Sequence, residues 1–248
     1  MYHYTWLEHI PGAADFFHSL HLDAYASPIL HAWLVCFLII IGAVLGRMKL
    51  NAVMASDNVE RFIPDSGLSI RNICELFVGG LHNLIKDVLG EDVRQPIFFS
   101  LLAGMFIFIL VSNWMGLVPG FAAPTGDINT NVAMALVVLV VFNVAGIMRN
   151  GMSYFTHLLG PIWWMAPLML VVESLGVFVV RPVSLSLRLT GNMFGDHLVF
   201  GIMSDLIPLV VPCIFLGLGA FVSFIQALVS TLLSAVYIAL ATAHEDEH

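Results

Sequence analysis

The sequence predicts an all-α, polytopic membrane protein, and three observations support that prediction. Of its 248 residues, 59% are hydrophobic and only 10% are charged, whereas soluble domains carry about 25% charged residues. The apolar runs are continuous and do not alternate, which favours membrane-spanning helices over a β-barrel. No repeat or low-complexity segment divides the chain. We therefore expect one membrane domain over residues 1–248, with about five or six long helices.

The first crossing is predicted at residues 28–46, after a mixed polar and aromatic lead-in. This apolar run is long enough to span the hydrocarbon core of a bilayer. Basic residues follow it, namely Arg47, Lys49, Arg61 and Arg71. Because basic residues gather on the cytoplasmic side of a membrane, the N-terminus is expected outside.

Residues 68–90 are predicted to form an amphipathic helix. Apolar residues recur there at helical spacing: Ile70, Ile73, Phe77, Leu81, Leu84, Ile85 and Val88. Charged and polar residues lie off that stripe: Arg71, Glu75, His82, Lys86 and Asp87. Such a helix lies on the cytoplasmic membrane interface or packs against a partner's surface, and the sequence does not separate the two.

Two further crossings are predicted at residues 96–118 and 131–148, joined by an outside loop at 124–130. In that loop, Asp127 or Asn129 is placed to cap the following helix. Arg149 then returns the chain to the cytoplasm. Three crossings that start from an outside N-terminus end on the cytoplasmic side. The number of crossings therefore agrees with the position of Arg149.

The last third of the chain predicts a long, steeply tilted helical hairpin. Two apolar stretches of about 40 residues each reach about 55–60 Å, twice the thickness of a bilayer core. Neither holds a polar turn, because Pro182 and Gly191 are only weak breakers. We expect helices over 161–203 and 206–243 that turn near Ser204 and Asp205 and return the C-terminus to the cytoplasm.

Arg188 lies inside the first of these stretches. From Gln95 to Ala243 only seven residues carry a formal charge: Asp127, Arg149, Glu173, Arg181, Arg188, Asp196 and Asp205. A guanidinium in the bilayer costs about 2.5–3.5 kcal/mol on insertion scales, and it cannot lose its proton to avoid that cost. A permanent cation at this depth predicts a functional site.

Small and polar residues share one narrow helix face with Arg188. At 100° per residue, Arg181 falls at about +20°, Ser184 at about −40° and Asn192 at about +40° from it. No acid of the chain lies on that face within one turn, so a carboxylate from another chain is the expected partner. The alternative is that Arg188 pairs internally with Glu173 or Asp196.

The neighbouring polar residues leave several roles open. Asp196 and His197 line a water-filled vestibule or form buried hydrogen bonds, with His197 on the back of the helix. Gln226 across the hairpin and Asn192 on the same helix are candidates to hydrogen-bond Arg188. Arg181 snorkels to an interface or forms a structural pair.

Other chemistries are not indicated. The ten histidines show no ligand spacing, so no metal site is expected. A phosphate-binding loop, a nucleophile elbow and a basic face are also lacking, so we expect no cofactor, no nucleic-acid partner and no ATP chemistry on this chain.

The segment from Arg181 to Asn192 resembles the signature of subunit a of the F-type ATP synthase membrane sector. Its parts are Arg181-Pro182-Val183-Ser184-Leu185 and Arg188-Leu189-Thr190-Gly191-Asn192. The run from Asn113 to Gly120 resembles the end of that family's second crossing, and Pro124 to Thr130 resembles the loop that follows. There are two departures: Gly219 stands where some members carry a histidine, and Glu173 lies eight residues before Arg181 where seven are expected.

The resemblance implies a proton-translocating stator in a bacterial inner membrane. It implies a rotating ring of c subunits and b-type peripheral-stalk subunits as partners, together with two aqueous half-channels. Arg188 would be the charge that faces the ring carboxylates. Asn192, His197 and Gln226 match polar channel-side positions, Glu173 the channel glutamate, and Asp127 would lie near the outside mouth. The coupling ion, H⁺ or Na⁺, stays open. A rival reading is a stand-alone channel or secondary transporter, which should carry its own acid beside Arg188 and show internal repeats.

Overall fold

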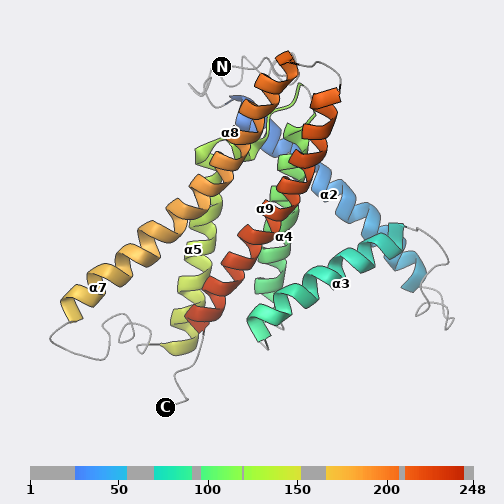
Figure 1. Ribbon diagram of the computed structural model, residues 1–248. Coiled ribbons are helices and arrows are strands. Elements are labelled where there is room, and N and C mark those ends of the chain that lie inside the picture. Colours follow the sequence, from blue (N-terminus) through green and yellow to red (C-terminus); the bar gives the residue numbers. More distant parts are fainter. Residues whose placement is uncertain are drawn as a thin grey trace.

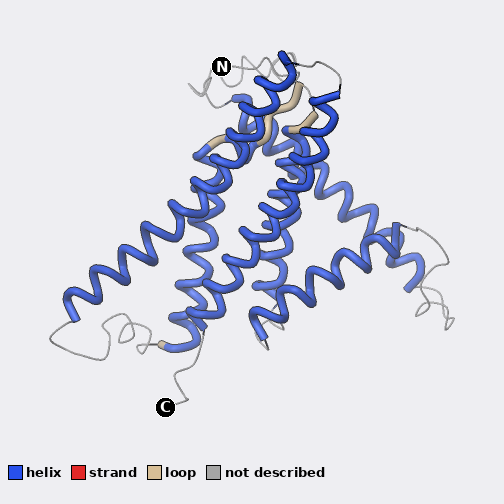
Figure 2. The backbone as a smooth tube through the Cα atoms, in the orientation of Figure 1, coloured by secondary structure: helices blue, strands red, loops and turns tan. Residues whose placement is uncertain are grey.

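The fold is a bundle of long helices. A computed structural model describes residues 26–54, 70–90, 96–118, 120–151, 166–206 and 210–242, and no strand occurs within these ranges. Figure 1 shows the helices side by side, and Figure 2 shows that short loops join them at one end. The predicted all-α class is confirmed.

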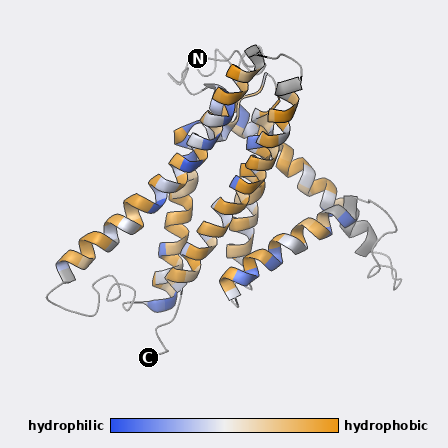
Figure 3. Cartoon of the chain, viewed as in Figure 1, coloured by the Kyte–Doolittle hydropathy of each residue, from blue (hydrophilic) through white to orange (hydrophobic). Residues whose placement is uncertain are grey.

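Five described helical segments are long and apolar enough to cross a membrane. These are Ser27–Met48, Ile97–Gly116, Ile128–Asn150, Pro167–Met203 and Cys213–Thr242. Many of their exposed side chains are large and apolar, and most of the ribbon of these helices is coloured orange for hydrophobic residues in Figure 3. This is the pattern of a multi-pass membrane protein, whose helices satisfy their backbone groups internally and face lipid with apolar side chains.

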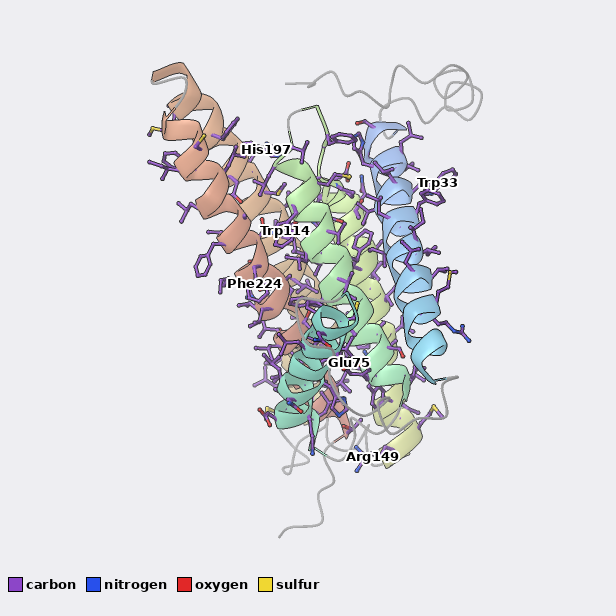
Figure 4. All side chains as sticks on the ribbon, turned by 90° about the vertical axis from the view of Figure 1, so that its right-hand side faces the viewer. Trp33, Glu75, Trp114, Arg149, His197 and Phe224 are labelled. Carbon is purple, nitrogen blue, oxygen red and sulfur yellow. The ribbon has the colours of Figure 1, made fainter. Side chains whose placement is uncertain are left out.

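Helix α2 spans Ala26–Met54 and is longer than the predicted crossing at 28–46. It continues past Arg47 because arginine, lysine and methionine are good helix formers and no proline or glycine stops the helix there. His31 and Val35 are fully buried, whereas Trp33 is 62% exposed and points away from the bundle (Figure 4). One face of α2 therefore packs inward and the other is left for lipid.

Helix α3 spans Ile70–Leu89, and its apolar stripe packs within this chain. Leu81, Ile85 and Leu89 are buried in the main apolar core together with residues of α4 and α9. The Phe77 ring lies 5.7 Å from the Phe106 ring of α4, centroid to centroid. The apolar stripe of α3 was predicted to face lipid or a partner. The protein's own helices cover much of this stripe.

Helix α4 spans Pro96–Gly116, a short 3₁₀ turn η5 spans Pro124–Gly126, and α5 spans Ile128–Asn150. The Asp127 carboxylate accepts a hydrogen bond of 2.7 Å from the backbone N–H of Asn129. Of the two candidates, Asp127 is therefore the cap. Because of it, α5 begins three residues before the predicted start at 131.

The hairpin is formed by two rods. The first joins α7 (Ala166–Leu175), a π-helical segment η6 (Gly176–Val180) and α8 (Arg181–Leu206); the second is α9 (Val210–Thr242). Ser204 and Asp205, the predicted turn, are still helical, and residues 207–209 lie outside the described residues. The predicted start at 161–165 also lies outside them.

The π-helical segment was not predicted, and Pro182 gives its physical reason. A proline inside an α-helix lacks an N–H donor and its ring clashes with the carbonyl four residues earlier. In this rod the Arg181 N–H donates to the carbonyl of Gly176, five residues back. The wider turn before Pro182 eases that clash without breaking the helix.

Candidate functional site

Arg188 lies on the edge between the buried and the uncovered face of α8. Leu185, Leu189 and Met193 are at most 4% exposed and pack into the bundle, whereas Leu187 is 55% exposed. Arg188 itself is partly buried. Within the described ranges its guanidinium makes no hydrogen bond and no ion pair. A permanent charge is thus held beside an apolar surface without a neutralising group from the described part of its own chain.

Contacts made by α8 residues before and after Arg188 show which part of α5 lies beside it. Thr190 contacts Asn131 in the first turn of α5, and Arg181 contacts Phe142 near the middle of that helix. Arg188 is therefore level with the apolar part of α5.

The two hydrogen bonds suggested for Arg188 are not formed. Gln226 is buried, and its Nε2 donates to Ser230 Oγ at 3.4 Å on the same helix. The Nδ2 of Asn192 is buried and has no hydrogen-bond partner among the residues that the structure describes.

Asn192 and Asp196 continue from Arg188 at four-residue spacing towards the end of the bundle that holds η5. Asp196 is partly buried, and its Oδ2 is a buried oxygen that receives no hydrogen bond from the described part of the chain. His197 is exposed, on the other side of the helix. Figure 4 places His197 towards one end of the molecule and Arg149 towards the other. Polar groups thus extend from Arg188 towards the end opposite Arg149.

The remaining predicted residues are spread along the fold. Ser184 is exposed on α8, close to the uncovered face. The carboxylate of Asp127 caps α5. The backbone of Glu173 belongs to α7, and its side chain lies outside the described part of the structure. Arg181 is partly buried, and its guanidinium lies over two rings, 5.6 Å from the centroid of Phe142 and 4.9 Å from that of Tyr237.

A buried polar connection, which the sequence did not predict, ties α4 and α5 to α8. Thr125 Oγ1 donates to Asn113 Oδ1 at 2.5 Å. Asn131 Nδ2 donates to the carbonyl of Thr125 at 2.7 Å and to Thr190 Oγ1 at 2.8 Å. Asn113, Thr125 and Asn131 are at most 2% exposed. Hydrogen bonds among such buried groups fix helix positions, because breaking them leaves polar atoms unsatisfied.

Gly116 allows α4 to approach this connection closely. A Cβ at that position would lie 2.6 Å from the Ala123 Cβ and would also collide with Met193 of α8. Asn113 and Gly116 of α4 therefore serve close packing in this part of the structure. Gly116 brings α4, the loop before η5 and α8 together directly behind the face that carries Arg188.

Fold and site together define a class: a multi-pass helical membrane protein that holds, beside an uncovered apolar face, a cation with no partner among the described residues. A family model described as ATP synthase A chain matches residues 29–239. Subunit a of ATP synthase from Trichlorobacter lovleyi is 41% identical over 222 residues, which cover 89% of this chain and 90% of that relative. Subunit a from Geobacter sulfurreducens is 39% identical over 88% of this chain and 89% of its own length. The chain belongs to the ATP synthase A chain family.

Proposed function

We propose that this chain is the proton-translocating stator subunit of an F-type ATP synthase membrane sector, and that Arg188 is its fixed charge. Family membership supports a part in ATP synthesis and proton transport. The single observation that supports the role of Arg188 is its lack of an ion-pair or hydrogen-bond partner among the described residues. A buried charge that is not paired inside its own chain is stabilised when a partner supplies the opposite charge.

The partner in this proposal is a rotating ring of c subunits, each of which carries a carboxylate. The ionised carboxylate is attracted to Arg188, whereas the protonated, neutral form can enter lipid. Protonation therefore releases a ring subunit from Arg188, and the ring turns by one step. The guanidinium also blocks a direct proton path, because it does not give up its own proton.

Two half-channels would deliver and remove the protons. Asn192 and Asp196 follow Arg188 towards the end opposite Arg149, so they belong with His197 and Asp127 to an outer path. Glu173, on the rod leading to Arg181, belongs to the proton-accessible wall as well, and the buried Gln226 of α9 is a further polar residue of the path. A histidine is suited to such a path because its proton exchanges near neutral pH. The driving force is about 2.3 kcal/mol per charge for each 100 mV.

The proposal includes an orientation and further partners. The N-terminus lies outside and the C-terminus in the cytoplasm of a bacterial cell, so that Arg47 and Arg149 are on the cytoplasmic side. The b-type peripheral-stalk subunits hold the chain still while the ring turns. Protease or thiol accessibility of tags at the two ends in oriented vesicles tests the orientation.

The experiment that tests the function is proton-driven ATP synthesis in vesicles that contain the assembled complex. Arg188→Ala is expected to reduce synthesis to background, because no cation remains to attract the ring carboxylates. Leu187→Ala is the matched control, since Leu187 is 55% exposed on the same turn and carries no charge. Co-purification of the ring subunit shows that each variant assembles. Near-normal synthesis by an assembled Arg188→Ala complex would end the proposal.

A further inference from the structure

The Arg181 guanidinium lies against two aromatic rings that come from two other helices. The guanidinium carbon lies 5.6 Å from the centroid of Phe142 on α5 and 4.9 Å from that of Tyr237 on α9. The two rings are themselves 6.2 Å apart, and Phe142 is 1% exposed. A guanidinium within about 6 Å of a ring centroid is attracted to the ring face. We call Phe142 and Tyr237 the aromatic clamp.

The aromatic clamp acts where the rotation of α8 is set. Arg181 is the first residue after the π-helical segment Gly176–Val180, and its N–H closes the last π-type hydrogen bond. A π turn changes the angular phase of the residues on its two sides. The direction of the α8 side chains therefore depends on contacts made by α8 itself as well as on its link to α7.

Arg188 lies between two such contacts. Arg181 is seven residues before it, almost two full turns and about 20° away around the helix. Thr190, two residues after it, is tied to Asn131 by a hydrogen bond of 2.8 Å. The segment between the two contacts is continuous α-helix, so a rotation at Arg181 is transmitted to Arg188.

We propose that Arg181 is a positioning residue, and that the aromatic clamp holds α8 in the one rotation that points Arg188 along its uncovered face. The inference rests on the proposed function of Arg188. In this inference Arg181, the second cation of the rod, positions α8 and does not contact the c-subunit ring. Small displacements of a reacting group cost large factors in rate, so loosening the clamp should reduce coupling without removing any charge at position 188.

The first test is a set of paired variants assayed for proton-driven ATP synthesis in vesicles. Tyr237→Leu removes the ring and is expected to lower the rate about tenfold. Tyr237→Phe keeps the ring face and is expected to restore the rate, because the attraction depends on the ring and not on the hydroxyl. Arg181→Gln should resemble Tyr237→Leu, and Arg181→Lys should lie between Arg181→Gln and the unaltered chain. Val236→Ala, at a neighbouring residue that is 37% exposed, is the matched control.

The second test measures the rotation directly. Spin labels are placed at Ile202→Cys on α8 and Leu38→Cys on α2, both exposed, after replacement of Cys36, Cys74 and Cys213 by alanine. Electron–electron distances are then recorded in the assembled complex in nanodiscs. Tyr237→Leu is expected to shift or broaden the distance distribution, and Tyr237→Phe to leave it unchanged.

The two proposals fail in different ways. If Tyr237→Leu and Arg181→Gln leave both the rate and the label distance unchanged while Arg188→Ala is inactive, only the positioning role is wrong. It is also wrong if Tyr237→Phe is as impaired as Tyr237→Leu. If Arg188→Ala retains synthesis, the stator role is wrong, and the label distances still decide whether the clamp sets the rotation of α8.

Discussion

Asn131 of α5 donates a hydrogen bond of 2.8 Å from its side-chain amide to Thr190 Oγ1 of α8, two residues beyond Arg188. The same amide nitrogen donates to the carbonyl of Thr125 at 2.7 Å. One buried side chain thus links the loop before α5, α5 itself and the helix that carries Arg188. This link holds α8 at one position along α5 and in one rotation about its own axis, and it thereby helps to position Arg188.

Replacing Asn131 by alanine should destabilise the complex and lower its rate of ATP synthesis. The change leaves the Thr125 carbonyl and the Thr190 hydroxyl without their donor in a buried site, which costs about 1–3 kcal/mol. Thermal dissociation of the purified complex measures the effect. Asn129→Ala is the control, because that exposed residue contributes only its backbone N–H. Equal stability of the two variants would contradict the linking role.

Gly116→Ala should disturb the packing between α4 and α8. The new Cβ would lie 2.6 Å from that of Ala123 and would also collide with Met193, and overpacking of this kind costs about 1–3 kcal/mol. Gly104→Ala on the same helix meets no atom within 4 Å and should be neutral or stabilising. Assembly yield and thermal stability compare the two variants, and a Gly116→Ala chain as stable as Gly104→Ala would contradict the close approach.

Substitution of Asp127 separates a structural from a proton-carrying role. Asp127→Ala removes the cap of α5 and should cost about 0.5–2 kcal/mol. Asp127→Asn keeps a good capping group and removes the charge, so it should preserve stability. Proton flux through vesicles stripped of the catalytic sector is the second measurement. Reduced flux in a stable Asp127→Asn complex would support its place at the outer mouth, and unchanged flux would remove Asp127 from the path.

His197→Ala should slow passive proton flow severalfold without preventing assembly. His197 is exposed on α8 towards the end of the molecule opposite Arg149, and in the proposed outer path a histidine would assist proton transfer. The flux through stripped vesicles is compared with that of Leu198→Ala, a neighbouring exposed residue that does not titrate. Should the two variants conduct equally, His197 does not belong to the proton path.

Ile85→Ala should destabilise the attachment of α3 by about 2–5 kcal/mol, because Ile85 is fully buried in the core shared with α4 and α9. Leu76→Ala on the same helix is the control, since Leu76 is 80% exposed. Protease sensitivity of the α3 region in the purified complex reports the difference. If both variants are cut at the same rate, the buried stripe does not hold α3 in place.

The sequence was sufficient for features that depend on local patterns. Continuous apolar runs gave the membrane class, helical spacing gave the amphipathic stripe of α3, and one charge in an apolar stretch singled out Arg188. The partners of these features were not predictable in the same way. Asn131 and Thr190 are 59 residues apart in sequence, and no periodicity relates them. The surface that covers α3 is likewise distant, on α4 and α9.

The aromatic clamp shows the same limit. Arg181 was expected either to snorkel or to form a structural pair, and Phe142 and Tyr237 gave no signal as its neighbours. Buried aromatic residues are usually core residues. Arg181 reaches the two rings only because α5, α8 and α9 pack together at this point. Such contacts depend on packing across the whole bundle.

The π-helical segment also changes how positions on the rod should be compared between relatives. Five-residue hydrogen bonding accommodates one residue more per turn than an α-helix does. The eight residues from 173 to 181 therefore cover about the same rotation as seven residues of regular helix. The Cα of residue 173 keeps the angular relation to Arg181 that a chain one residue shorter would have. A relative that lacks one residue at 176–180 would therefore have a shorter chain there. The residues on both sides of the gap would still face the same way around the helix.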